Sequence, residues 1–118
     1  DEGFQIAQNM LQTNPDIRII FGQADGLAMG AAKAVEVAGL ADQVIVGGYD
    51  GDGAALESLV ACDTPFIVTA TQSTQAMGVL AVNSAIAVAN DASVPARQIP
   101  NAVLTTCDDA AQFVEKHP

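Results

Sequence analysis

Two carboxylates stand in the glycine-rich stretch GGYDGDG, residues 47–53, which directly follows an apolar run. Side chains of this type can bind a metal, cap a helix, take part in acid–base chemistry or accept hydrogen bonds from a ligand. An EF-hand calcium loop that starts at Asp50 needs an oxygen ligand at its fifth position and a Glu at its twelfth. Those positions hold Ala54 and Ala61, so we exclude a calcium loop here.

Other kinds of site lack their motifs. The glycines of residues 47–53 do not follow G-x-G-x-x-G, and the chain contains no phosphate-binding G-x-x-x-x-G-K-[ST] loop. No His, Lys or Arg lies near Asp50 and Asp52 in the sequence, and no G-x-S-x-G motif is present. A lone His117 and two cysteines without a CxxC spacing argue against zinc. We therefore expect no enzyme activity, no cofactor and no metal.

The three central aspartates have different expected roles. Asp25 and Asp52 each stand where a helix is expected to begin, so Asp25 is interpreted first as a helix cap and Asp52 as a helix cap or a solvated carboxylate. Asp50 ends an apolar strand and is flanked by Gly48 and Gly51. We expect these glycines to let the backbone turn and to leave room for a bound molecule, so we assign Asp50 to ligand contact.

Helical and strand patterns alternate along the whole chain. Helices are expected over residues 2–13, 25–38, 53–61 and 73–89 and from Asp108 or Asp109 onward, and strands over residues 17–21, 44–46, 65–70 and 103–105. This order predicts an open parallel sheet with helices on both faces, a three-layer α/β fold. The loops 22–25, 47–52 and 71–75 then meet at the carboxyl edge of the sheet, where ligands bind in such folds.

Composition excludes two classes of partner. The 118 residues suit one small domain, and 14 acidic residues against 4 basic ones give a net charge of −10. Because nucleic acids and anionic membrane surfaces attract clustered Lys and Arg, neither is an expected partner. The longest apolar region, residues 76–89, is too short to span a bilayer and is expected to form a buried helix.

The two cysteines, Cys62 and Cys107, allow two interpretations. They form one disulfide if the protein is exported, or they are two small core residues if it is cytosolic. The sequence leaves both open.

Three segments, FGQADGLAMGAAKAVEVAG, VIVGGYDG and TATQSTQAMG, together resemble the ribose-type periplasmic sugar-binding proteins, the solute receptors of ABC importers. The resemblance implies a periplasmic-binding-protein type I fold, in which a sugar is held between two lobes that close by a hinge. It maps residues 1–118 onto part of the second, C-terminal lobe as a single α/β domain. It also implies a periplasmic or other extracytoplasmic location, with a sugar and a membrane ABC permease as partners.

The same resemblance assigns individual residues to the ligand site. Asp50 matches an aspartate that holds sugar hydroxyls, and Gln72 matches a glutamine that touches ligand. Ala24 stands where the family has a ligand-binding asparagine, so the ligand would lose one contact or differ from the common pentoses and hexoses. Asp25 matches the aspartate that follows that asparagine and completes the set of candidate site residues.

The resemblance also predicts that the lobe is truncated. The family's lobe begins with two further strands, which would flank Ile17–Phe21, and without them this strand is an open edge. We therefore expect the chain to be a fragment that is completed by a missing N-terminal lobe or by a second copy of itself.

Two other function classes remain as alternatives. The effector domain of a LacI-type transcription regulator shares this fold, but those regulators have a proline in the approach to the aspartate, which residues 41–44 lack. A small α/β enzyme of receiver or hydrolase type would need a catalytic constellation, which this sequence does not contain.

Overall fold

The computed structural model describes residues 2–114, and the chain divides into two compact units. The first unit comprises Asp1–Thr71 and Leu104–Pro118, and the second comprises Gln72–Val103. The expectation that residues 1–118 form a single domain depends on how the units fit together in the protein, and it stays a prediction.

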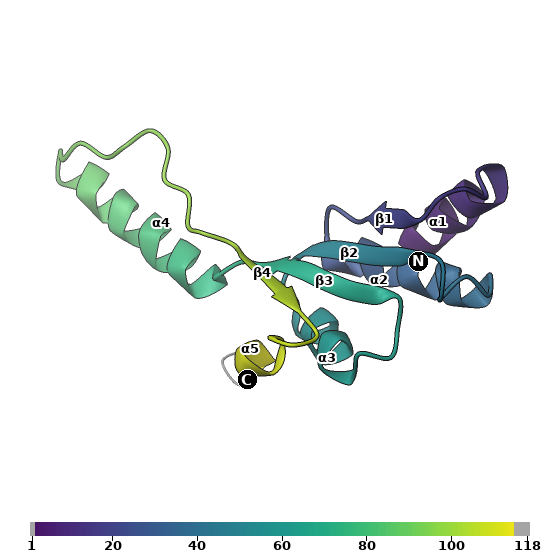
Figure 1. The fold of residues 1–118 in the computed structure, drawn as a ribbon. Coiled ribbons are helices and arrows are strands. Elements are labelled where there is room, and N and C mark those ends of the chain that lie inside the picture. The colour runs from purple at the N-terminus through teal and green to yellow at the C-terminus, as the bar shows by residue number, and fades with distance from the viewer. Residues whose placement is uncertain (1, 115–118) are drawn as a thin grey trace. The chain divides into compact units, whose positions relative to one another are not determined.

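The order of elements agrees with the alternating pattern of the sequence (Figure 1). The elements are α1 (Glu2–Thr13), β1 (Ile19–Phe21), α2 (Asp25–Val37), β2 (Ile45–Asp50), α3 (Gly53–Ala61), β3 (Phe66–Thr71), α4 (Thr74–Ala89), β4 (Val103–Thr106) and α5 (Ala111–Val114). β1 starts two residues later than predicted, because Ile17 still donates its amide to Asn14 O in the preceding turn. β2 extends further than predicted, and Asp50 is its last residue.

The sheet has the strand order β1-β2-β3-β4, and the pairs β1–β2 and β2–β3 are parallel, as predicted. Consecutive parallel strands joined by right-handed crossovers place their connecting helices on the same face of a sheet. Helices α2 and α3 therefore lie together on one face (Figure 1). The strands' carboxyl ends share one edge, where Asp50 is paired with Thr71.

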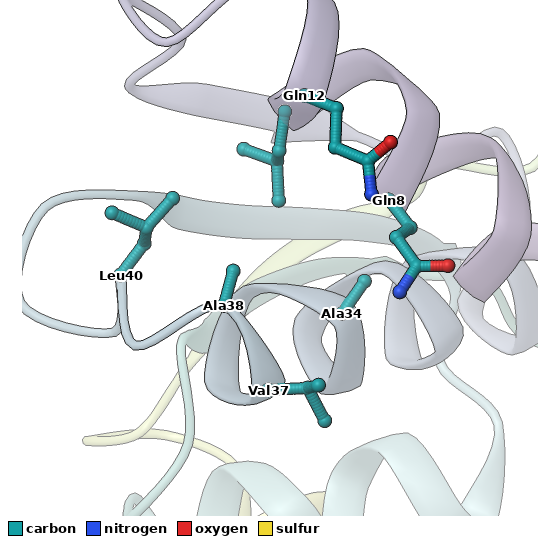
Figure 2. A pocket seen from close by; sticks show the side chains of 7 residues that line it. Gln8, Gln12, Ala34, Val37, Ala38 and Leu40 are labelled. Carbon is teal, nitrogen blue, oxygen red and sulfur yellow. The ribbon is translucent and has the colours of Figure 1, made fainter.

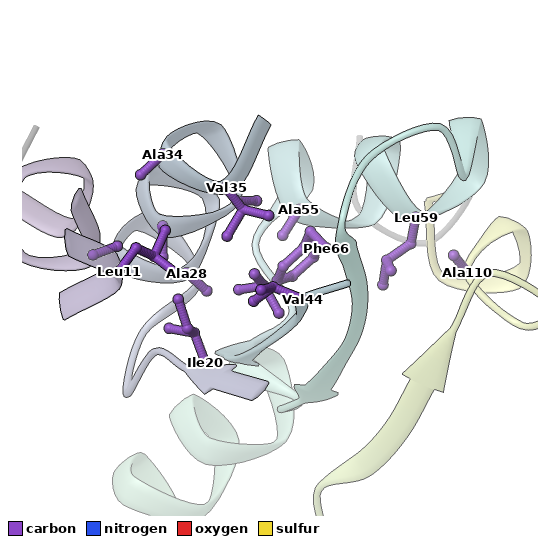
Figure 3. Packing of buried hydrophobic residues seen from close by; sticks show 14 residues of the cluster. Leu11, Ile20, Ala28, Ala34, Val35, Val44, Ala55, Leu59, Phe66 and Ala110 are labelled. Carbon is purple, nitrogen blue, oxygen red and sulfur yellow. The ribbon is translucent and has the colours of Figure 1, made fainter. Parts of the chain in front are cut away.

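The core lies between α2, α3 and the strands (Figure 3). Ala and Val make up most of the buried apolar set, as the scarcity of aromatic residues predicts. Their small side chains let α2 approach the sheet closely, and Phe66, which is 1% exposed, fills the space beside Val44 and Val46. This packing fixes the helix and strand ends that carry the candidate site.

Within the first unit, the opposite face of β1, β2 and β3 carries apolar side chains. Ile19 is 70% exposed and Phe21 63%, and Ile45 and Ile67 are also exposed. The sequence predicted helices on both faces of the sheet. Among the described residues of this unit, α2 and α3 cover one face. β1 lies at the end of the strand order, which agrees with the predicted open edge.

The second unit contains α4 and residues 90–103. Ser73 caps the helix by accepting a hydrogen bond from the Ala76 amide at 3.1 Å. None of the residues of α4 is buried within its own unit. The expectation of a buried helix depends on how the two units fit together, and it stays a prediction. Within this unit, Gln98 Nε2 donates a hydrogen bond to Ser84 Oγ of α4 at 3.0 Å. None of the helices in residues 2–114 is long and apolar enough to cross a membrane.

The open edge leads to a prediction about the isolated 118-residue chain. An edge strand offers unpaired backbone groups, and Phe21 adds an exposed ring beside them, so we expect the chain to self-associate. Phe21→Lys places a charge at this edge and should raise the dimer dissociation constant at least about tenfold. Sedimentation velocity would measure it. The matched control is Val60→Lys on α3, where Val60 is 49% exposed, and equal effects of both substitutions would contradict an edge-specific contact.

Candidate functional site

Asp50 lies at the carboxyl end of β2, half-buried and opposite Thr71 of β3. Its φ angle is 129°, which L-residues rarely adopt, and the next residue, Gly51, has φ 78°. Such a conformation costs about 1–3 kcal/mol at a non-glycine residue and persists only where the surroundings impose it. The carboxylate that sequence analysis assigns to the ligand is therefore on a constrained segment of backbone.

The constraint comes from Asp25, the first residue of α2, which is fully buried. Its Oδ2 accepts hydrogen bonds from the backbone amides of Gly51 at 2.8 Å and Asp52 at 2.9 Å. Its Oδ1 accepts one from Thr69 Oγ1 at 2.6 Å. Hydrogen bonds to a charged group contribute about 1.5–3 kcal/mol each, so the two amide bonds alone can offset the strain at Asp50.

The predicted helix caps are partly corrected. Ala24, and not Asp25, is the N-cap of α2, and it makes no side-chain cap bond because alanine has no acceptor. Asp25 is drawn instead toward the loop that follows β2. Asp52 is the N-cap of α3, as predicted, but its side chain also makes no cap bond.

The glycines beside Asp50 have one of their two predicted roles, since Gly51 turns the backbone with a φ of 78°. A Cβ at Gly48 would clash with Asp25 Oδ1 and lie 2.9 Å from the ring of Phe66. A Cβ at Gly51 would lie 2.5 Å from the Cγ2 of Thr71, and Gly51 also has a positive φ. The expectation that these glycines leave room for a bound molecule is therefore wrong, because the protein's own side chains fill that room.

Gly48→Ala should consequently destabilise the protein strongly. The added methyl group would displace a buried carboxylate that makes three hydrogen bonds, and we expect a loss of about 2 kcal/mol or more in the free energy of unfolding. Gly53→Ala is the control, since a Cβ at Gly53 meets nothing within 4 Å. The control should lie between neutral and about 1 kcal/mol more stable. Urea unfolding measures both, and equal effects would contradict the argument.

The pKa of Asp52 is raised above its ordinary value of 3.8, first by partial burial and then by the negative charges of Asp25 and Asp50. A raised pKa in the folded state means that the folded protein holds this proton more tightly than the unfolded chain does. The contribution of Asp52 to stability therefore falls as pH rises through the range just above 3.8.

The two remaining predicted site residues are Ala24 and Gln72. Ala24 directly precedes Asp25 and is half-buried. Gln72 is the first residue of the second unit and is also half-buried. In the first unit the end of β3 is tied to β4 by a 2.6 Å hydrogen bond between the buried hydroxyl groups of Thr71 and Thr105.

Two hollows elsewhere in the first unit are less suitable for a polar solute. One, of about 200 Å³, lies between α1 and α2, where the amides of Gln8 and Gln12 reach over Ala34 and Val37 (Figure 2). It lies toward the carboxyl end of α2, away from Asp25, and no charged side chain lines it. The other, of about 410 Å³, lies beside β1 and is mainly apolar. In residues 2–114, no group of three or more His, Cys, Asp or Glu side chains is placed to hold a metal ion.

The cysteines form a disulfide, Cys62–Cys107, with their Cα atoms 5.6 Å apart. It joins the end of α3 to the turn that follows β4. Of the two interpretations that the sequence left open, a disulfide or two separate core cysteines, the structure shows the disulfide.

Sequence reasoning missed Thr69 and the structural role of Gly48. One signal was available, because Thr69 is a hydroxyl residue inside the apolar run of residues 65–70. The structure places it in β3, where it is fully buried. A hydroxyl group at such a position needs a buried partner. Nothing in the local sequence identifies that partner as Asp25, which is 44 residues away.

Comparison with known proteins identifies a family that the chain matches. Residues 1–93 match the family described as "Periplasmic binding protein domain". The "Ribose import binding protein" of Bacillus subtilis is 33% identical over 84 residues, which is 71% of this chain and 26% of that protein. The "D-ribose/D-allose-binding protein" of Pseudomonas aeruginosa is 34% identical over 86 residues, which is 73% of this chain and 26% of that protein. The chain thus spans about a quarter of the length of these relatives.

Solved structures show the same fold. An ABC transporter periplasmic solute binding protein from Actinobacillus succinogenes with bound D-allose has a TM-score of 0.83 and 30% identity, covering 93% of this chain and 38% of that one. An ABC transporter solute binding protein from Bacillus halodurans with bound myo-inositol has a TM-score of 0.85 and 31% identity, covering 98% of this chain and 39% of that one.

Proposed function

This chain belongs to the periplasmic binding protein domain family, and from that premise we propose that it is part of a receptor that binds a sugar or polyol and delivers it to a membrane ABC permease. The observation that carries the proposal is the position of Asp50, a carboxylate held at the carboxyl edge of a parallel sheet. Ligands bind at this edge in open α/β folds. An ionised carboxylate accepts hydrogen bonds from two hydroxyl groups at once, which suits a polyhydroxylated solute.

In this proposal the site residues contribute unequally. Asp50 and Gln72 hold the hydroxyl groups, while Ala24 leaves one side of the site without a polar side chain. Asp25 does not contact the ligand, since its oxygens are buried, and it contributes to the site by holding the residue that follows Asp50. The second wall of the cleft comes from an N-terminal lobe or from a second copy of the chain. The protein acts by binding, and not by catalysis.

Two further observations support this function. One relative named above is a ribose import binding protein, and the two solved structures are of ABC transporter solute binding proteins, which favours a receptor over the alternative of a LacI-type regulator. The disulfide favours an oxidising compartment, because thiols in the cytosol are kept reduced. We therefore place the protein in the periplasm or elsewhere outside the cytoplasm.

Isothermal titration calorimetry on the longest natural protein that contains this chain tests the proposal. D-ribose, D-allose and myo-inositol are the first probes, with L-glutamate as a control of similar size that carries charge. We expect at least one of these three polyhydroxylated compounds, the two sugars and myo-inositol, to bind with a dissociation constant in the micromolar range or tighter. L-glutamate should not bind. Binding of the amino acid alone, or of none of the polyols, would refute the proposal.

A further inference from the structure

We propose that Asp25 is a positioning residue, which touches no ligand itself but fixes the loop that presents Asp50. This inference rests on the proposed function, in which Asp50 holds the solute. Asp25 is fully buried, so its carboxylate does not reach the surface where a solute would bind. Both of its oxygens are already engaged by Gly51, Asp52 and Thr69.

These hydrogen bonds join three parts of the fold. Asp25 begins α2, Gly51 and Asp52 follow β2, and Thr69 lies in β3. Asp25 is 26 residues from Gly51, 27 from Asp52 and 44 from Thr69 along the sequence. The hydrogen bonds therefore connect segments that are far apart in the chain. The buried carboxylate is thus the point at which the ends of two neighbouring strands are held in register.

The hydrogen bonds to Asp25 act directly on the conformation of Asp50. The amides of the two residues that follow Asp50 converge on a single oxygen, Oδ2, at 2.8 and 2.9 Å. Consecutive backbone amides in a turn form a concave site for an anion, and the Asp25 carboxylate occupies that site from within the protein. Because both amides are held, the backbone of Asp50 stays at its φ of 129° and cannot relax.

The surroundings leave space for this carboxylate and for little else. Gly48 lies against Asp25 Oδ1, where any larger residue would clash with it. Thr69 Oγ1 fixes the carboxylate from the opposite strand. The negative charge of Asp25 also contributes to the raised pKa of Asp52, because the two carboxyl groups lie close together.

Asp25→Asn is the main test, because it keeps the side-chain shape and removes the charge. In the ligand-free chain, NMR should show amide hydrogen exchange at least tenfold faster at Gly51 and Asp52, with Val35 and Leu59 in the core unchanged. The pKa of Asp52 should fall. In the longest natural protein, the affinity for D-ribose, or for the polyol that the wild type binds best, should fall at least tenfold. Circular dichroism must show each variant folded at the assay temperature, and Asp63→Asn, an exposed carboxyl, is the matched control.

If Asp25→Asn does not fold, Thr69 provides a second route. Thr69→Val removes the hydroxyl donor at nearly constant volume and should speed exchange at both amides, whereas Thr69→Ser retains the donor and should restore protection. Wild-type exchange at Gly51 and Asp52 in a folded Asp25→Asn or Thr69→Val variant would overturn the inference, and so would unchanged polyol affinity. A wild type that binds no polyol would refute the proposed function alone, and the exchange measurement would still decide whether Asp25 holds the loop.

Discussion

Loss of the Cys62–Cys107 disulfide is expected to lower the free energy of unfolding by about 4 kcal/mol. The cysteines are 45 residues apart, and a cross-link over a loop of that length removes much of the conformational entropy of the unfolded chain. Small domains have total stabilities of about 5–15 kcal/mol, so this loss is a large fraction of the whole. The effect should be largest near α3 and β4, the elements that the bridge joins.

Urea unfolding of the wild type with and without dithiothreitol would measure this loss. The double variant Cys62→Ser/Cys107→Ser should resemble the reduced wild type, and dithiothreitol should not affect it further. A change below about 1 kcal/mol on reduction would contradict the prediction. Because the first unit also carries Asp25 and Asp50, a folded but reduced protein should retain the hydrogen bonds of the site.

The second large effect is expected on binding. Asp50→Ala should weaken binding of the polyol by at least about 100-fold, because hydrogen bonds to a charged group contribute about 1.5–3 kcal/mol each and two would be lost. Asp50→Asn should have a smaller effect, since Asn keeps one acceptor oxygen and tolerates positive φ better than most residues do. Titration calorimetry on the longest natural protein measures both.

Asp63→Ala is the control for this prediction, because Asp63 is an exposed carboxylate in the loop before β3, at the opposite edge of the sheet. It should leave the affinity within about twofold. The melting temperature of Asp50→Ala should stay close to that of the wild type, since Asp50 is half-buried and outside the core. Retained polyol affinity in Asp50→Ala would remove Asp50 from the binding site.

The elements of this protein follow from local sequence, and they were predictable for that reason. Apolar periodicity and the breaks at Asn14-Pro15 and Gly39 give the helices and strands, and their alternation gives a parallel sheet. Parallel strands bring their carboxyl ends to one edge whatever the details of packing. The position of Asp50 at that edge is therefore a property of the sequence.

The roles of the residues around Asp50 depend on contacts between distant segments. Asp25 was predicted to cap its own helix, yet its carboxylate meets amides 26 and 27 residues away, since the folded sheet puts them within hydrogen-bonding distance. Gly48 was assigned to ligand clearance, whereas packing places Asp25 and Phe66 in that space. The sequence could not decide whether Cys62 and Cys107 form a disulfide for the same reason. A disulfide requires the two Cα atoms to lie within about 7 Å of each other, which depends on the folded structure.

The sequence by itself thus determined the order of elements, the parallel sheet and the edge at which Asp50 lies, because these depend on near neighbours and on the handedness of the chain. The tertiary structure alone decided that Asp25 is a buried support and that Gly48 accommodates it. It also paired the two cysteines. Each of these features depends on the distance between atoms far apart in the chain, and only the packed structure fixes such distances.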